Sequence, residues 1–153
     1  MAGAGSAAGD AVILLVFDRA AEILTIISGS ASVQFPAANN AQRSSRGPWP
    51  AGIFEAESLL RVDGPDGALE GKFGRWFLRF AVPDRDGDPD TADGPGVGMA
   101  IHAGRTGETD LAGRSNHRHA TDGCIRTVPD AMVAISREWD RLGGGAARLW
   151  VVS

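Results

Sequence analysis

Short apolar runs separated by turn-forming residues make up much of the amino-terminal half of this chain. Runs rich in Val, Ile, Leu and Phe alternate with Gly, Asp and Ser, which is the pattern of short β-strands joined by tight turns. The first three runs follow one another closely enough to form an antiparallel meander. In a later run, Trp76, Leu78 and Phe80 alternate with other residues and give one strongly apolar face. The expected strands are residues 11–17, 22–28, 32–35, 53–62, 75–82, 97–102 and 147–152.

A helix is predicted near the carboxyl end, from residue 129 to residue 142. Apolar side chains recur there at helical spacing, which places Met132, Ile135, Trp139 and Leu142 on one face. Pro129 suits the first turn, and consecutive glycines follow the last one. Polar, Pro-rich and Gly-rich stretches between the strands predict irregular loops at 37–50 and 83–96. The pattern therefore predicts a mainly β domain, a curved sheet or β-sandwich, with one principal α-helix after the cysteine.

Length, composition and net charge bear on the number of domains and on the partners of the chain. The chain has 153 residues, 43% of them hydrophobic, which suits one domain with its own core. We expect residues 1–10 to be a flexible amino terminus and residues 11–153 to be the domain. The apolar run 11–17 is too short to span a membrane, and no export signal is visible. A net charge of -4 with scattered arginines argues against nucleic acid as a partner, and the oligomeric state stays undetermined.

Candidate chemistry centres on the one cysteine of the chain, which lies in the run TDGCIR at 121–126. A thiol is mostly protonated at neutral pH, so a nucleophilic cysteine needs a base or a positive charge close by. His102, at the end of an apolar run, can be that base. Gly123 permits a sharp turn that directs backbone amides toward a tetrahedral intermediate, and Arg126 carries a planar fork suited to a carboxylate. These residues favour covalent acyl transfer on Cys124.

The pattern resembles the L,D-transpeptidase catalytic domain of the YkuD type. In that family a histidine closes a strand, and a Ser/Thr-His-Gly-Cys motif follows a variable loop. The matching segments here are 101–104 and 121–126, and the proline-glycine turn leading into a strand at 47–54 is also similar. The resemblance implies a cysteine enzyme that attacks the third residue of a peptidoglycan stem peptide, releases D-alanine, and transfers the acyl group to an amine or to water. It implies no metal or organic cofactor, and a periplasmic or cell-envelope location.

The same resemblance assigns roles to individual residues. Cys124 becomes the nucleophile, His102 the general base and Gly123 an oxyanion donor. The expected substrate contacts come from the motif and the loops near it: Arg126, Thr121, Asp122, His119 and Trp49. Asp122 stands where the family usually has a second histidine, so it is suited to orienting His102 or His119 rather than to donating a hydrogen bond. Trp49 suits a groove wall and core packing equally well.

Other interpretations stay open. The aspartate at 122 is compatible with an L,D-carboxypeptidase, a secreted peptidoglycan-targeting toxin of the same fold, or a noncatalytic cell-wall binding module. His117 and His119, together with His102 and Cys124, are zinc-ligand types, but the spacing of a known zinc motif is missing. The acidic run at 84–93 lacks the glycine and glutamate positions of an EF-hand. Transfer to an amine and transfer to water share one acyl-enzyme, so the sequence does not separate them.

Overall fold

The computed structural model describes residues 12–40, 49–61, 76–80, 100–104, 117, 124–144 and 146–152. Within these residues the protein is mainly β with one principal helix, as predicted. The strands are β1 (Ile13–Asp18), β2 (Ile23–Ser28), β3 (Ala31–Ala38), β4 (Gly52–Arg61), β5 (Trp76–Phe80), β6 (Ala100–His102), β7 (Ile125–Thr127) and β8 (Ala147–Val152), and helix α3 (Pro129–Arg141) lies between β7 and β8. The amino-terminal segment 1–10 and the expected loop at 83–96 lie outside the described residues.

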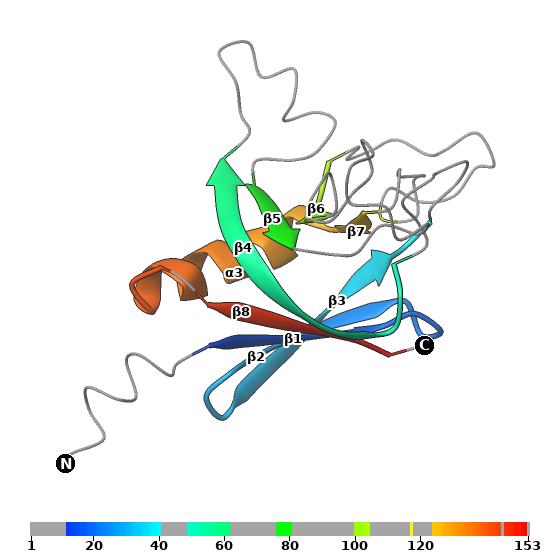
Figure 1. Cartoon of the computed structure of the whole chain (residues 1–153), viewed down its shortest axis with the longest axis horizontal. Helices are drawn as coiled ribbons and strands as arrows, with labels where there is room; N and C mark the ends of the chain where they lie inside the picture. Colours follow the sequence, from blue (N-terminus) through cyan, green and yellow to red (C-terminus); the bar gives the residue numbers. More distant parts are fainter. Residues whose placement is uncertain are drawn as a thin grey trace, which may run out of the picture.

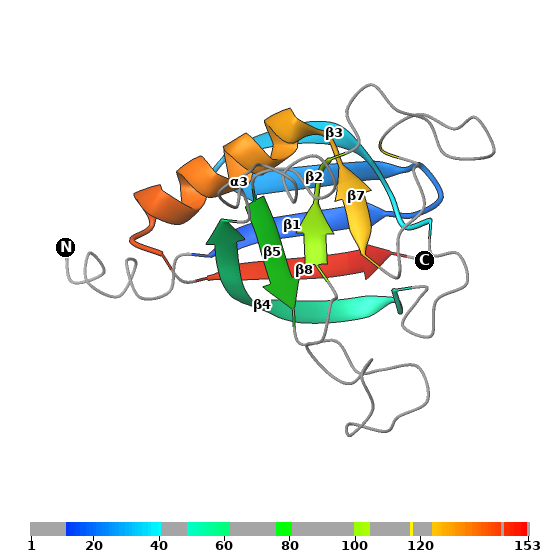
Figure 2. The same cartoon turned by 90° about the horizontal axis from the view of Figure 1, so that it is seen from above.

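The strands close into a barrel in the order β1-β2-β3-β7-β6-β5-β4-β8. The predicted meander is confirmed, because β1 pairs with β2 and β2 with β3, both antiparallel. Seen from above, β5, β6 and β7 form a layer over β1, β2 and β8, and α3 runs along one side of the barrel (Figure 2). The expected curved sheet is thus closed upon itself, which removes exposed strand edges.

Two strands pass from one layer to the other and so close the barrel. The first part of β4 pairs with β8, and its second part pairs with β5. A register shift lies at the start of the part that pairs with β5, between Ala56 and Ser58, and β4 curves strongly along its length (Figure 1). A bulge of this kind adds a residue to one strand and bends it. β3 behaves similarly, since it pairs first with β2 and then, through Ala37 and Ala38, with β7.

The hydrophobic core fills the space between the two layers. Alternate residues of β1 and β8 point inward and are fully buried, as period-two strands with one buried face require. On α3, Met132 and Ile135 are buried while Trp139 and Leu142 pack against the core, so the predicted apolar face is confirmed. Pro129 occupies the first turn of α3 as expected. The inner side chains of greatest volume are Trp49, Phe17, Phe80, Ile13, Leu15, Leu24, Leu78, Ile101, Ile125, Ile135 and Leu149.

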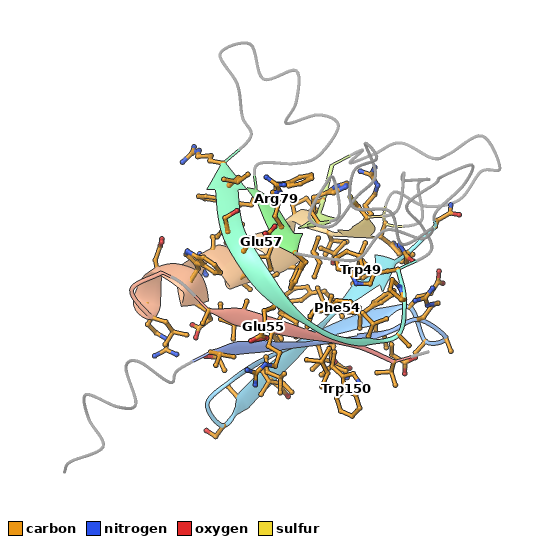
Figure 3. The ribbon with its side chains drawn as sticks, in the orientation of Figure 1. Trp49, Phe54, Glu55, Glu57, Arg79 and Trp150 are labelled. Atoms are coloured by element: carbon orange, nitrogen blue, oxygen red, sulfur yellow. The ribbon has the colours of Figure 1, made fainter. Side chains whose placement is uncertain are left out.

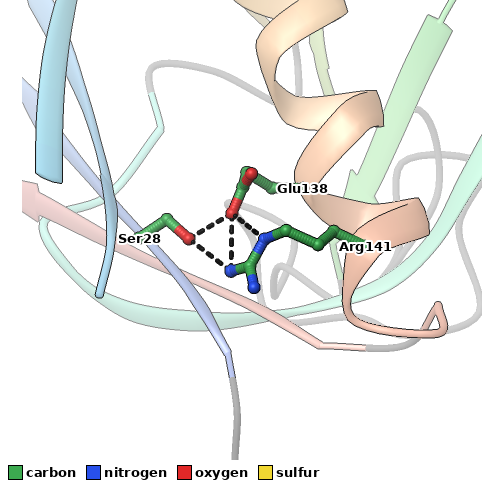
Figure 4. Close-up of polar contacts among 3 residues, drawn as sticks. All are labelled: Ser28, Glu138 and Arg141. Atoms are coloured by element: carbon green, nitrogen blue, oxygen red, sulfur yellow. Dashed lines mark hydrogen bonds and ion pairs between the residues drawn. The ribbon is translucent and has the colours of Figure 1, made fainter. Parts of the chain in front are cut away.

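A polar contact holds the end of α3 against β2. The Ser28 hydroxyl donates to the carboxylate of Glu138, and Arg141 Nε donates to the same carboxylate oxygen at 2.9 Å (Figure 4). The hydrogen bond from Arg141 is the main cause that lowers the pKa of Glu138 below its usual value, with the Ser28 hydroxyl adding to it. This cluster lies at the rim of the barrel, where Arg141 is exposed to solvent.

Two parts of the β structure differ from the sequence prediction. β7 was not expected, because three residues are too few to show a periodicity, and the sequence indicated only a turn before the helix. β3 runs on through Pro36 to Ala38, whereas the sequence placed 37–50 in a loop. Both differences have one cause, since Ala37 and Ala38 pair with Thr127 and Arg126 of β7, which are distant in sequence. In the part of the chain that the structure describes, no helix is long and apolar enough to cross a membrane.

Candidate active site

The candidate site is built on a short parallel pair of strands, β6 and β7. Ile101 lies opposite Ile125, and His102 lies opposite Arg126. Because side chains alternate along a strand, each pair of partners occupies one face of the sheet. Ile101 and Ile125 belong to the core cluster, so they mark the inner face. His102 and Arg126 therefore lie on the opposite face of the same two strands.

Cys124 immediately precedes β7, the strand that pairs with the strand of His102. It lies two residues before Arg126, which returns its side chain to the same side of the strand. Continuing the parallel register puts Cys124 beside Ala100, two residues along β6 from His102. Two residues in those positions of an ideal parallel pair would have Cα atoms about 8 Å apart, a distance that a cysteine and a histidine side chain can bridge. Cys124 is 5% exposed and is the one cysteine of the chain.

The imidazole of His102 is held by the backbone at the end of its own strand. Its Nδ1 lies 2.8 Å from the carbonyl oxygen of Ala103. A carbonyl oxygen only accepts, so Nδ1 carries the proton in this hydrogen bond. The neutral ring therefore has its lone pair on Nε2, which is the form that a general base requires. Gly104, with a φ of 92°, turns the chain immediately after this carbonyl in a conformation that favours glycine.

Aromatic packing also fixes the orientation of this ring. Phe77 lies opposite His102 in the β5–β6 pair. The two rings are stacked, with their centroids 5.4 Å apart and their planes 4° from parallel. Stacking restricts rotation about the imidazole χ angles, and His102 is only 1% exposed. The ring thus has both a hydrogen bond and a packing contact that hold it in one orientation.

Arg126 shares the hydrogen-bond acceptor of His102. Its Nη1 donates to the carbonyl oxygen of Ala103 at 2.8 Å, and the residue is 3% exposed. A carbonyl oxygen has two lone pairs, so it can accept from both side chains at once. Ala103 thereby joins the base candidate on β6 to the arginine of the cysteine motif on β7. The carboxylate-binding role of Arg126 stays a prediction from the sequence.

Trp49 lies in the core rather than at the surface. It has no exposed area, and its ring packs edge-on against Phe54 at 5.9 Å and against Phe80 at 5.5 Å between centroids. Figure 3 shows Trp49 beside Phe54 inside the barrel, while Trp150 projects from the outer surface. Of the two roles that the sequence left open for Trp49, packing is the one that these contacts describe.

A polar network connects the backbone of Trp49 to that of Cys124. The carboxamide of Asn39 accepts from the Trp49 backbone N–H at 2.7 Å and donates to the Cys124 carbonyl at 3.0 Å. The guanidinium of Arg19 donates to the Trp49 carbonyl and, at 3.4 Å, to Asn39 Oδ1. Burial lowers the pKa of Arg19 from its usual value, although an arginine stays protonated throughout the physiological range.

Several residues singled out by the sequence lie outside the described part of the chain. They are Gly123, Thr121, Asp122 and His119, and most of the loops expected to form the walls of a groove lie outside it as well. Among the described residues, no group of three His, Cys, Asp or Glu side chains is arranged to hold a metal ion. His117 lines a surface cavity of about 360 Å³ with Glu22, which precedes β2, and with residues of β2 and β3 such as Gln34.

Three partners of the candidate site were missed by sequence reasoning. The Ala103 carbonyl has no signature in a sequence, because every residue carries a carbonyl group. Phe77 reads as an ordinary strand residue, and its contact with His102 depends on strand register. Asn39 did offer a signal, since a polar Asn pair directly follows an apolar run and such residues often bond to nearby backbone.

Comparison with known proteins supports the fold alone. No protein-family model matches this sequence, and no curated protein matches it. The Bd1075 protein of Bdellovibrio bacteriovorus is similar in structure, with a TM-score of 0.61 and 15% identity over 93% of this chain and 48% of its own. An L,D-transpeptidase of Mycobacterium tuberculosis H37Rv has a TM-score of 0.55 and 13% identity, covering 94% of this chain and 58% of its own.

A third solved structure extends the same comparison. The L,D-transpeptidase of Xylanimonas cellulosilytica has a TM-score of 0.51 and 14% identity over 93% of this chain and 61% of its own. This chain therefore spans between 48% and 61% of the length of these three proteins. The described residues of this chain form a mainly β barrel with one helix after β7. The domain has the L,D-transpeptidase fold.

Proposed function

We propose that this domain is a cysteine-dependent L,D-transpeptidase or L,D-carboxypeptidase that acts on peptidoglycan stem peptides. Cys124 is the nucleophile and His102 the general base in this proposal. The observation that carries it is the hydrogen bond of His102 Nδ1 to the Ala103 carbonyl, at the end of the strand that pairs with β7, which Cys124 immediately precedes. Thiol activation requires a histidine with its lone pair on Nε2 beside the cysteine, and His102 is held in that form.

The first half-reaction forms a thioester. His102 Nε2 takes the proton from Cys124 Sγ, and the thiolate attacks the carbonyl carbon of the third stem residue. The resulting oxyanion is stabilised by backbone N–H groups at Gly123 and Cys124, at about 3 kcal/mol per donor. When the intermediate collapses, the bond to D-alanine breaks and the departing amine takes the proton from His102. The acyl group is then attached to Cys124.

The second half-reaction releases the acyl group. An amine of another stem, or water, loses a proton to His102 Nε2 and attacks the thioester carbonyl. The carbon–sulfur bond breaks, and the Cys124 thiolate recovers the proton. The two outcomes differ only in the acceptor, so one site supports both transfer and hydrolysis. In this proposal the protein acts in the periplasm or cell envelope, where stem peptides occur.

Mass spectrometry provides the direct test. The wild-type protein is incubated with a tetrapeptide muropeptide, and both the products and the intact protein are weighed. Loss of D-alanine without a dimer identifies hydrolysis, while a cross-linked dimer identifies transfer. A transient protein adduct is expected on Cys124, because a thioester intermediate is covalent. Wild-type protein that gives neither product nor adduct would contradict the proposal.

A pair of alanine variants completes the test. Cys124→Ala should abolish both product and adduct, while Ser136→Ala, at a small buried side chain of α3, should retain them. If Cys124→Ala keeps every activity and the protein merely binds peptidoglycan, the protein is a noncatalytic wall-binding module. Treatment with a chelator should leave activity and melting temperature unchanged. A loss of both would instead identify a zinc protein that uses histidine ligands.

A further inference from the structure

The backbone of Cys124 is held by a side chain that belongs to another strand. Asn39 follows β3, whose last residue, Ala38, lies opposite Arg126 of β7. Beyond this pair the regular ladder between β3 and β7 ends. Asn39 Nδ2 then donates to the Cys124 carbonyl at 3.0 Å. A carboxamide has the same donor and acceptor groups as a peptide, so this side chain takes the place of the next backbone hydrogen bond.

The acceptor side of the same carboxamide is also occupied. Asn39 Oδ1 accepts from the Trp49 N–H at 2.7 Å and from Arg19 Nη1 at 3.4 Å. Trp49 is immobilised by its fully buried ring, and Arg19 donates a further bond to the Trp49 carbonyl. The planar carboxamide of Asn39 therefore connects the backbone of Cys124, just before β7, to the backbone of Trp49, which is anchored in the core. Its plane is fixed from both ends, which also fixes the direction of the Nδ2–H bond.

We infer that Asn39 is a positioning residue for Cys124, and that its carboxamide holds the nucleophile's peptide in the orientation that faces His102. This inference rests on the proposed role of Cys124 as nucleophile. The Cys124 carbonyl is one bond from the Cα that carries the thiol, so releasing it allows the Cα–Cβ direction to rotate. His102 is held independently, by the Ala103 carbonyl and by Phe77. Loss of Asn39 therefore changes the position of one partner only.

Two substitutions separate the donor from the acceptor of Asn39. Asn39→Asp keeps an acceptor for the Trp49 N–H and adds a charge pair with Arg19, but it removes the donor to Cys124. Asn39→Leu has a similar shape and carries no charge, and it removes both the donor to Cys124 and the acceptor for the Trp49 N–H. Gln34→Glu is the matched control, because it makes the same amide-to-carboxylate change at an exposed residue of β3. The Leu variant also shows whether any effect of Asp comes from its added charge.

The kinetic test uses the tetrapeptide muropeptide. Both Asn39 variants should lower kcat about tenfold or more while KM changes by less than about threefold, because misplacement acts on the reacting geometry. Asn39→Asp should keep a near wild-type Tm, and Gln34→Glu should match the wild type throughout. A merely structural role would lower Tm and the yield of folded protein but leave kcat per folded molecule unchanged. Wild-type kcat in folded Asn39→Asp and Asn39→Leu would overturn the inference.

A second measurement does not depend on peptidase activity. The chain has one cysteine, so iodoacetamide modifies a single thiol and its rate is followed by intact mass. The midpoint of the rate against pH should rise in Asn39→Leu toward that of an ordinary thiol, about 8.5, as pairing with His102 weakens. If the muropeptide is not processed by the wild type, the proposed function fails and this midpoint decides the inference alone. An unchanged midpoint in both variants would contradict it.

Discussion

The barrel contains two parallel strand pairs, and they differ in length and in burial. β1 and β8 pair along their whole length, from Ile13 opposite Ala147 to Asp18 opposite Val152. Their residues alternate between a buried inner face and a more exposed outer face. β6 and β7 pair through Ile101 and His102 only, and every residue of both strands is buried.

The difference shows which pair maintains the fold and which positions polar groups. The outer face of the long pair, β1 and β8, carries side chains that are exposed to solvent, such as Trp150, which is 49% exposed (Figure 3). Its polar contact is an exposed ion pair of Arg148 with Glu55 at 2.8 Å. A hydrogen bond from Arg148 is the main cause that lowers the pKa of Glu55. Such surface pairs contribute little to stability.

The short pair, β6 and β7, instead buries His102 and Arg126 on the face away from the core. Burial of polar side chains costs free energy unless hydrogen bonds compensate for it. The Ala103 carbonyl compensates in part, because it accepts from both residues. Local exceptions to hydrophobic burial of this kind are expected at functional sites, where chemistry requires the polar groups. The comparison therefore assigns stability to β1 and β8, and the placement of buried polar groups to β6 and β7.

Substitution of His102 should have the largest effect on reactivity. His102→Gln should slow acylation of Cys124 about 10²- to 10⁴-fold, because it removes the proposed general base. The rate of adduct formation with the muropeptide, followed by intact mass, measures this. His117→Gln makes the same change at a histidine beside β2 and β3, and it should keep the wild-type rate. An equal loss of rate in both variants would contradict the proposed role of His102 as general base and would favour a histidine metal site.

Truncation in the long pair should affect stability and leave the chemistry intact. Leu15 is fully buried and lies opposite Leu149, so Leu15→Ala should lower the free energy of unfolding by about 2–5 kcal/mol. Leu14→Ala, on the half-buried outer face of the same strand, should cost clearly less. Urea unfolding measures both. Per folded molecule, the acylation rate of Cys124 should stay at the wild-type value, and a parallel loss would mean that the two pairs are not independent.

The smallest effect is expected at the rim contact between β2 and α3. Glu138→Gln weakens the contacts with Ser28 and Arg141 and should lower Tm by about 1 °C at neutral pH. The pKa of Glu138 is lowered in the folded state, so its contribution is present above the ordinary value of 4.5 and is lost as pH falls through the folded pKa.

Melting curves across this pH range test the sign. The difference between wild type and Glu138→Gln should shrink on acidification, and Asp140→Asn provides a matched change in the same helix. A difference that grows toward acidic pH would contradict the assigned direction. A large effect at neutral pH would show that rim contacts matter as much as the buried polar groups of β6 and β7.

Much of the secondary structure follows from local patterns. The alternation in β1 and β8 and the helical spacing of Met132 and Ile135 are properties of neighbouring residues, and the structure confirms them. β7 does not follow in this way, because Ile125 to Thr127 become a strand only through pairing with β3 and β6. The same applies to Ala37 and Ala38, which the pattern alone places in a loop.

The sequence by itself determined the strand and helix periodicities, the single cysteine, and the histidine suited to act with it, because residue type and spacing suffice for these. Only the tertiary structure decided that β4 and β3 pass between layers, that His102 and Arg126 share the Ala103 carbonyl, and that Asn39 bonds to Cys124. These features depend on register between segments far apart in the chain. Register is fixed by the simultaneous burial of all strands in one core, which no local stretch of sequence contains.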